Sequence, residues 1–151
     1  MSDKDWMQRA FELAEKAKAQ GEVPVGAIIV HDNKIIGEGW NQPISSNDPT
    51  AHAEIIALRD AGNNIGNYRL IDATMYVTLE PCVMCTGAIV HARLAKLVYA
   101  ADDPKTGACG SVFNLLQTEE LNHKVEIEKG IMEDECRSLI QTFFKDKRAK
   151  L

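Results

Sequence analysis

The chain has 151 residues, of which 45% are hydrophobic and 26% charged, and its formal net charge is −5. This composition is typical of a globular protein that buries a core without disulfide staples, and we expect one domain over residues 1–151. No apolar run reaches the roughly 20 residues of a membrane span, and the charged N-terminus lacks the apolar stretch of a signal peptide, so we expect a cytoplasmic protein. The negative charge argues against broad, non-specific nucleic-acid binding, although the segment KDKRAK near the C-terminus offers a local basic surface.

The first part of the chain combines helical and strand patterns. Apolar residues recur at helical spacing near the N-terminus, and Gly21 ends that segment. Two β-rich runs flanking a short turn predict a hairpin. The expected elements are, in order, a helix over 5–19, strands over 25–30 and 35–40, a loop over 41–50 and a helix over 51–61.

The second part alternates strands with helices, which implies crossover connections and largely parallel pairing. The expected elements are a strand over 75–79, a helix over 82–92, a strand over 97–101, a polar loop over 102–110, a weak strand over 125–128 and a helix over 133–147. The fold class is therefore α/β, with a mixed sheet of about five strands between helical layers.

Two segments carry the residue types of a metal site, namely His52-Ala53-Glu54 and Pro81-Cys82-Val83-Met84-Cys85. The cysteine pair alone could be a redox dithiol, half of a structural zinc site or two packed cysteines. It lies at an expected helix start, where residues three apart share a face and the helix dipole favours the thiolate form that binds zinc.

His52, Cys82 and Cys85 make three candidate ligands without a clear fourth. The remaining cysteines and His91 lie far away in the expected elements. Structural zinc sites use four protein ligands, whereas catalytic sites use three and keep one position for water. The pattern favours catalysis.

Glu54 strengthens this interpretation, because a glutamate two residues from a ligand is not needed to hold a metal but can move protons. On a regular helix, residues i and i+2 point apart by about 200°. His52 and Glu54 can face one site only if His52 lies in an irregular first turn. Asp48-Pro49-Thr50 offers N-cap candidates for such a start.

The motif His-x-Glu followed by Pro-Cys-x-x-Cys resembles the signature of the zinc deaminase superfamily. Further segments resemble the bacterial tRNA adenosine deaminases (the TadA family) from about Trp6 to Phe144: EVPVGAIIV, IIGEGWNQP, DPTAHAEIIALR, NYRLIDATMYVTLEPCVMC and DPKTGA. The resemblance implies a three-layer α/β/α cytidine-deaminase-like fold.

It also implies a reaction, the hydrolytic deamination of adenosine to inosine at the wobble position (34) of a tRNA anticodon, with tRNA-Arg as the substrate. One Zn²⁺ per subunit, held by His52, Cys82 and Cys85, would activate the water that attacks adenine C6, and Glu54 would shuttle the protons as ammonia leaves. The resemblance implies a homodimer that binds the anticodon stem-loop, with no membrane or DNA partner expected.

Substrate contacts are inferred in two ways. By resemblance, Asn41 hydrogen-bonds the target nucleotide, Asp103 and Lys105 contact RNA, and the pocket is lined by Val23, Pro24, Ala53 and Leu79. From chemistry alone, Phe143 and Phe144 suit stacking on bases and Arg148 suits phosphate. The plainer alternatives are a turn asparagine at Asn41, solvated loop charges, and a core position for at least one phenylalanine.

Three other functions remain open at this point. The chain could be a deaminase of the same superfamily that acts on free cytidine, guanine or a riboflavin precursor. It could instead be a non-catalytic zinc module that binds RNA, or a thiol-disulfide oxidoreductase using Cys82 and Cys85.

Overall fold

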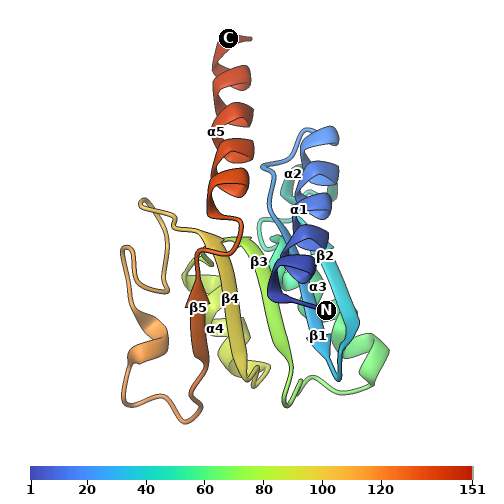
Figure 1. The fold of residues 1–151 in the computed structure, drawn as a ribbon, viewed down its shortest axis with the longest axis vertical. Helices are drawn as coiled ribbons and strands as arrows, with labels where there is room; N and C mark the ends of the chain where they lie inside the picture. Colours follow the sequence, from blue (N-terminus) through green and yellow to red (C-terminus); the bar gives the residue numbers. More distant parts are fainter. Residues whose placement is uncertain (151) are drawn as a thin grey trace.

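Five strands form one mixed sheet at the centre of residues 1–150, the part of the chain that the computed structural model describes (Figure 1). The strands are β1 (Gly26–His31), β2 (Lys34–Trp40), β3 (Thr74–Leu79), β4 (Lys96–Ala101) and β5 (Glu126–Lys129). The helices are α1 (Asp3–Ala19), α2 (Pro43–Ser46), α3 (Ala53–Ile65), α4 (Val83–His91) and α5 (Glu133–Ala149), with a 3₁₀ turn η1 (Leu115–Gln117).

The strand order is β2-β1-β3-β4-β5. β1 pairs antiparallel with both β2 and β3, whereas β4 pairs parallel with β3 and β5. The hairpin turns at Asp32 and Asn33, whose φ values of 49° and 59° match the two-residue turn that suits strand twist. The predicted mixed sheet and its hairpin are confirmed.

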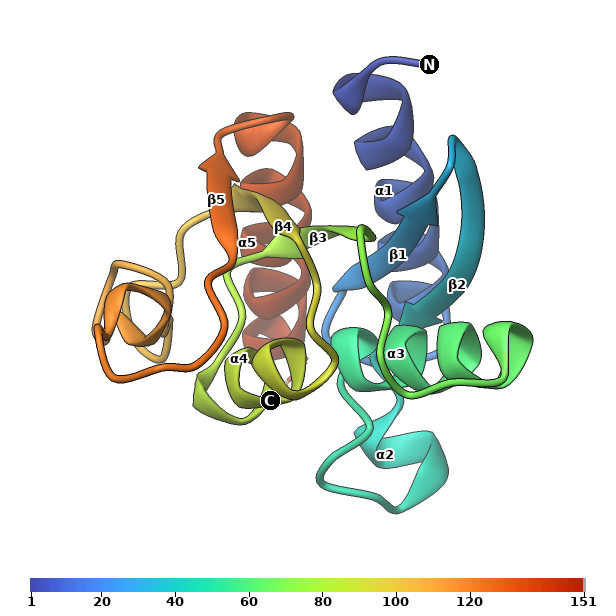
Figure 2. The same cartoon turned by 90° about the horizontal axis from the view of Figure 1, so that it is seen from below.

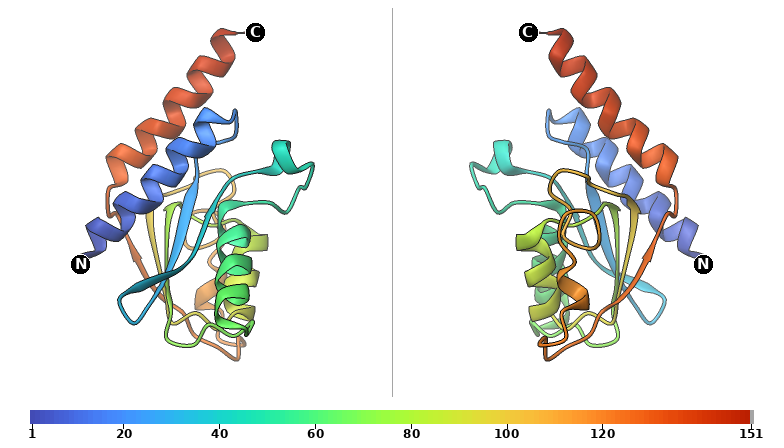
Figure 3. Two further views of the ribbon diagram at one scale, coloured as in Figure 1. Left: turned by 90° about the vertical axis from the view of Figure 1, so that its right-hand side faces the viewer. Right: turned by 90° about the vertical axis from the view of Figure 1, so that its left-hand side faces the viewer.

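Helices cover both faces of the sheet and give three layers. α1 and α5 lie on one face, while α3 and α4 lie side by side on the other (Figures 2 and 3). Each face has its own apolar core: Ile29, Met75, Val77 and Leu97 belong to the α3–α4 side, and Met7, Leu13, Ile28 and Val98 to the α1 side. The predicted α/β/α architecture is confirmed.

Helix α3 packs unusually close to the sheet, because glycines on β2 face small residues on the helix. A Cβ atom at Gly37 would lie 2.5 Å from the Ala57 carbonyl oxygen and 2.7 Å from the Ala61 nitrogen. Ala57 and Ala61 are fully buried on the helix face that meets the strand. This close packing fixes the distance between α3 and the sheet, and with it the position of the N-terminus of α3.

Besides the unforeseen η1, the structure differs from the sequence-based expectation over residues 41–65, where α3 ends at Ile65 instead of residue 61. The expected loop over 41–50 contains the short helix α2, which begins at Pro43. The next helix begins at Ala53 instead of residue 51, so the predicted cap within residues 48–50 is wrong. The Asp48 carboxylate accepts hydrogen bonds from the Thr50 N–H (2.8 Å) and hydroxyl (2.7 Å). It therefore stabilises a turn before the helix instead of capping the helix itself.

In the described part of the chain, no helix combines the length and the apolar character that crossing a bilayer requires.

Candidate metal and catalytic site

His52 occupies the N-cap of α3, with extended backbone angles of φ −72° and ψ 153°. Because His52 precedes the first helical turn, the direction of its side chain does not follow the helical geometry that would point residues i and i+2 apart. The Asn41 Oδ1 atom caps the helix instead, accepting the Ala53 N–H at 2.8 Å. His52 and Glu54 can thus face one site.

The two cysteines come from the start of α4, next to the start of α3. Cys82 is the N-cap residue, with ψ of 179°, and Cys85 lies in the first turn. Both helices point their N-termini toward this place, where unpaired N–H groups and the helix dipole favour negative charge. The backbone therefore assists the thiolate form of the sulfurs.

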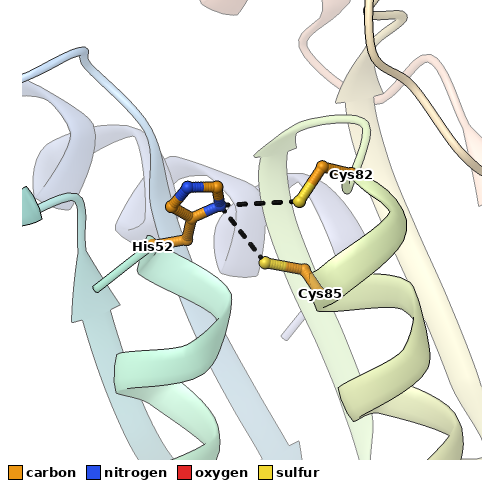
Figure 4. Close-up of side chains that lie close together, drawn as sticks. All are labelled: His52, Cys82 and Cys85. Carbon is orange, nitrogen blue, oxygen red and sulfur yellow. Dashed lines mark hydrogen bonds between the residues drawn. The ribbon is translucent and has the colours of Figure 1, made fainter. Parts of the chain in front are cut away.

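The three side chains converge (Figure 4). The His52 Nδ1 atom lies 3.6 Å from the Cys82 Sγ atom and 3.5 Å from the Cys85 Sγ atom. A tetrahedral zinc ion, about 2.3 Å from sulfur and about 2.0 Å from nitrogen, holds such atoms roughly 3.5 Å apart. Within residues 1–150, no further histidine, cysteine or carboxylate joins the group. The donor set and its spacing fit Zn²⁺ with one position left open.

Hydrogen bonds within the cluster shift the pKa values of its side chains in opposite directions. A bond with the Cys85 thiol, opposed by burial and assisted by His52, lowers the pKa of Cys82 to about 4. The same bond, together with burial, raises the pKa of Cys85 well above its ordinary value. The bond with Cys82 also raises the pKa of His52. A cation binding here would replace protons, as metal sites with thiolate and neutral imidazole ligands require.

Glu54 lies in the first turn of α3 with 4% of its surface exposed. Burial raises the pKa of Glu54 to about 7, although the charge of His52 and a bond with Cys85 partly oppose this shift. A carboxyl group with a pKa near neutrality can both accept and return a proton under ordinary conditions.

A cleft of about 600 Å³ lies between the loop that follows β4 and helix α5, and the residues that line it do not include His52, Glu54, Cys82 or Cys85. It brings together six residues that sequence reasoning assigned to substrate: Val23, Leu79, Asp103, Lys105, Phe144 and Arg148. Pro24 and Ala53 are buried outside the lining, and Asn41 is half-buried at the start of α3.

The two phenylalanines of α5 have different environments. Phe143 is 9% exposed, whereas Phe144 is 40% exposed and lines the cleft. Their rings meet edge to face with centroids 5.4 Å apart. Of the two, Phe144 lines the cleft, and Phe143 has the core position considered from the sequence.

Sequence reasoning missed two buried carboxylates that hold segments distant in the sequence. Glu22, 1% exposed, accepts the N–H groups of Ile44 (3.2 Å) and Ser45 (2.7 Å) in α2. Glu80, 2% exposed, binds the loop after β4. A charged residue between apolar positions was the available signal, but its partners lie more than twenty residues away in the chain.

Comparison with known proteins agrees with this geometry. The sequence model of the MafB19-like deaminase family matches residues 1–148. The tRNA-specific adenosine deaminase of Haemophilus influenzae is 54% identical over 147 residues, covering 97% of this chain and 85% of that protein.

Solved structures give the same result. One, from studies of A-to-I editing by tRNA:A34 deaminases, superposes with a TM-score of 0.87 at 39% identity over 89% of this chain and 98% of the other. A guanine deaminase from Nitrosomonas europaea has a TM-score of 0.79 at 23% identity, covering 94% and 84% of the two chains, and shares the fold. The chain belongs to the MafB19-like deaminase family and, by its identity over nearly the whole length, to the tRNA-specific adenosine deaminases.

Proposed function

We propose that this protein hydrolyses adenosine to inosine at the wobble position (34) of a tRNA anticodon, with tRNA-Arg as substrate, and releases ammonia. The observation that carries the proposal is a buried glutamate, Glu54, beside a three-ligand cluster in a chain 54% identical to a tRNA-specific adenosine deaminase. The family gives the reaction class, and the site supplies the groups that this reaction needs.

His52, Cys82 and Cys85 would hold one Zn²⁺ per chain. When bound, zinc supplies a Lewis acid that makes water a nucleophile at neutral pH. The chain supplies the donor atoms at matching spacing and two helix N-termini that favour the thiolates. A set of three protein ligands is the one that catalytic zinc sites use, so this donor set would suit a metal that activates water.

Glu54 would move the protons. Its buried carboxyl would accept a proton from the attacking water and deliver it to adenine N1. It would then take the remaining proton from the hydroxyl group added at C6 and pass it to the amino group, so that ammonia leaves as the C6 carbonyl forms. The pKa near 7 suits this alternation, because neither protonation state is strongly favoured at neutral pH.

Asn41 would hydrogen-bond the target nucleotide through its Nδ2 group, since Oδ1 already caps α3. Val23, Pro24, Ala53 and Leu79 would shape the pocket. The cleft wall formed by Asp103 and Lys105, together with Phe144 and Arg148 of α5, would hold the neighbouring RNA by stacking and phosphate contacts. Phe143 would support the ring of Phe144.

The protein would act in the cytoplasm as a homodimer. The outward side of α3 and α4 supports the dimer, because it carries exposed apolar side chains, among them Val83, Met84 and Tyr68, beside an open groove. Uncovered apolar surface of this kind often marks a protein interface.

The decisive experiment offers an anticodon stem-loop with adenosine at the wobble position, beside free adenosine, cytidine and guanine. We expect inosine only in the RNA. Turnover of a free base or nucleoside instead would favour another enzyme of the superfamily. Chelation of zinc should abolish the reaction and added zinc should restore it, whereas a thiol-disulfide oxidoreductase would not need the metal.

The matched variant is Glu54→Gln, which keeps the size of the side chain and removes its basicity. Zinc content should stay at one per chain while kcat falls by at least about 10²–10⁴-fold, the usual contribution of a positioned acid–base group. Loss of zinc would assign Glu54 a structural role. Unchanged RNA turnover would refute proton transfer by Glu54, and RNA binding without any turnover by the unmodified protein would favour a zinc RNA-binding module.

A further inference from the structure

A buried carboxylate connects the cysteine helix to the wall of the cleft. Glu80 follows β3 and lies two residues before Cys82. Its Oε1 atom accepts the Asp103 N–H (3.0 Å) and the Ser111 hydroxyl, and its Oε2 atom accepts the N–H groups of Cys109 (2.9 Å) and Ser111 (3.1 Å). In residues 1–150, the groups bound by this side chain all belong to one loop.

The loop over residues 102–111 is shaped around this carboxylate. The Gly107 N–H donates to the Asp103 carbonyl oxygen at 2.9 Å, and the Ala108 N–H donates to the Pro81 carbonyl oxygen at 2.9 Å. A Cβ atom at Gly107 would overlap the carboxyl group of Glu80. The loop therefore closes over Glu80 so tightly that it has no room for a side chain there.

The outer side of the same loop forms a wall of the cleft. Asp103, Lys105 and Thr106 line it opposite α5, and Leu79, the residue before Glu80, lines its floor. The Asp103 side chain is occupied within the loop, because it accepts the N–H groups of Lys105 (3.0 Å) and Thr106 (3.1 Å) and the Thr106 hydroxyl (2.7 Å). Lys105 therefore lines the cleft because of the way the loop is folded. Glu80 stabilises this fold through hydrogen bonds to Asp103, Cys109 and Ser111.

We propose that Glu80 is a positioning residue for RNA binding: it fixes the 102–111 loop in the form that lines the cleft, at a set distance from the cysteine cluster. A loop held in its binding form before RNA arrives does not have to be ordered on binding, so the bond network raises affinity without touching the reacting atoms. The proposal rests on the proposed function, since it takes RNA to be the ligand of the cleft.

The variant Glu80→Gln tests this inference. A glutamine keeps one acceptor oxygen but turns an N–H₂ group toward backbone N–H donors, leaving at least one of them unbonded. Because a buried unpaired donor is costly, we expect KM for the stem-loop to rise about tenfold while kcat changes less than about threefold. Amide hydrogen exchange should speed up within residues 103–111 and stay unchanged in β3 and β4, with zinc still at one per chain.

Two further variants complete the experiment. Ser111→Ala removes one hydroxyl donor and leaves the backbone donors, so it should raise KM by a smaller factor, and it replaces Glu80→Gln if that variant fails to fold. Glu38→Gln is the matched control, because Glu38 also accepts two bonds, from Arg9 (2.6 and 3.1 Å), on the edge strand β2. It should leave KM and loop exchange unchanged.

Two results for Glu80→Gln would overturn this role. One is unchanged hydrogen exchange in the loop, and the other is a fall in kcat as large as the rise in KM, together with loss of zinc. If the unmodified protein does not deaminate the RNA, the proposed function fails, but the exchange measurement still decides whether Glu80 holds the loop.

Discussion

The environment of Glu54 predicts how activity depends on pH. Burial raises the pKa of this carboxyl from its ordinary 4.5 to about 7, and only the ionised form can accept a proton from water. The ionised fraction falls as pH falls through the folded pKa, so kcat/KM should decline on the acid side with a slope of one proton. A bound cation favours the carboxylate, so the midpoint should lie no higher than about 7. A profile measured on the stem-loop that stays flat throughout the acidic range would contradict this prediction.

Asn41 combines two roles that mutations can separate. Its Oδ1 atom caps α3 at the Ala53 N–H, and its Nδ2 group is the proposed substrate contact. Asn41→Asp keeps the cap acceptor and loses the donor, so the free energy of unfolding should stay within about 0.5 kcal/mol while KM rises at least about tenfold. Asn41→Ala should lose about 1 kcal/mol of stability as well. Chemical denaturation and steady-state kinetics measure both. An aspartate variant with normal KM would leave Asn41 with the capping role only.

At the scale of elements, the position of α3 depends on its contact with β2. Gly37→Ala would force a methyl group between the backbone atoms of Ala57 and Ala61, and overpacking of this kind costs about 1–3 kcal/mol. Because α3 carries His52 and Glu54, a displaced helix should also weaken zinc retention and turnover.

The control for this prediction is Lys34→Ala, an exposed position on the same strand that should change stability by no more than about 0.5 kcal/mol. Denaturant unfolding of the three proteins measures the effect. Equal stability of Gly37→Ala and the unmodified protein would show that α3 can move away from the sheet without cost.

The sequence predicted those elements whose signals are local. Periodic apolar residues, turn residues and the two short motifs were enough for the helices, the hairpin, the alternation after it and the residues of the cluster. The start of α3 was misplaced because its cap comes from Asn41, which lies twelve positions before Ala53 in the connection after β2. Glu22 and Glu80 were missed for the same reason, since their hydrogen bonds join segments that only the folded chain brings together.

For the whole molecule, a net charge of −5 has to be reconciled with an RNA ligand. The charges on α5 are segregated: Glu133, Asp134 and Glu135 lie in its first turn, and Lys147 and Arg148 lie in its last turn. This last turn projects beyond the sheet (Figure 1). Basic residues thus outnumber the single acidic residue, Asp146, in the last turns of α5, where Arg148 lines the cleft, while three acidic residues lie in the first turn. Local charge, more than the total, suits binding of a phosphate backbone.

Exposed apolar side chains near α3 and α4, on the opposite side of the sheet, lead us to expect a dimer. Tyr68, which lines the α3–α4 groove, is 67% exposed, and Met84 in the first turn of α4 is 37% exposed. We expect sedimentation equilibrium to give twice the mass of one chain at micromolar concentration. Tyr68→Glu combined with Met84→Glu should give the monomer, because a buried unpaired charge at an interface is costly. Ile44→Glu, a change at an apolar position 64% exposed on α2, is the control and should leave the dimer intact. A monomeric unmodified protein, or a dimer that survives the double change, would contradict an interface on this face. If the double variant is a monomer, its RNA affinity shows whether the cleft of a single chain is sufficient for binding.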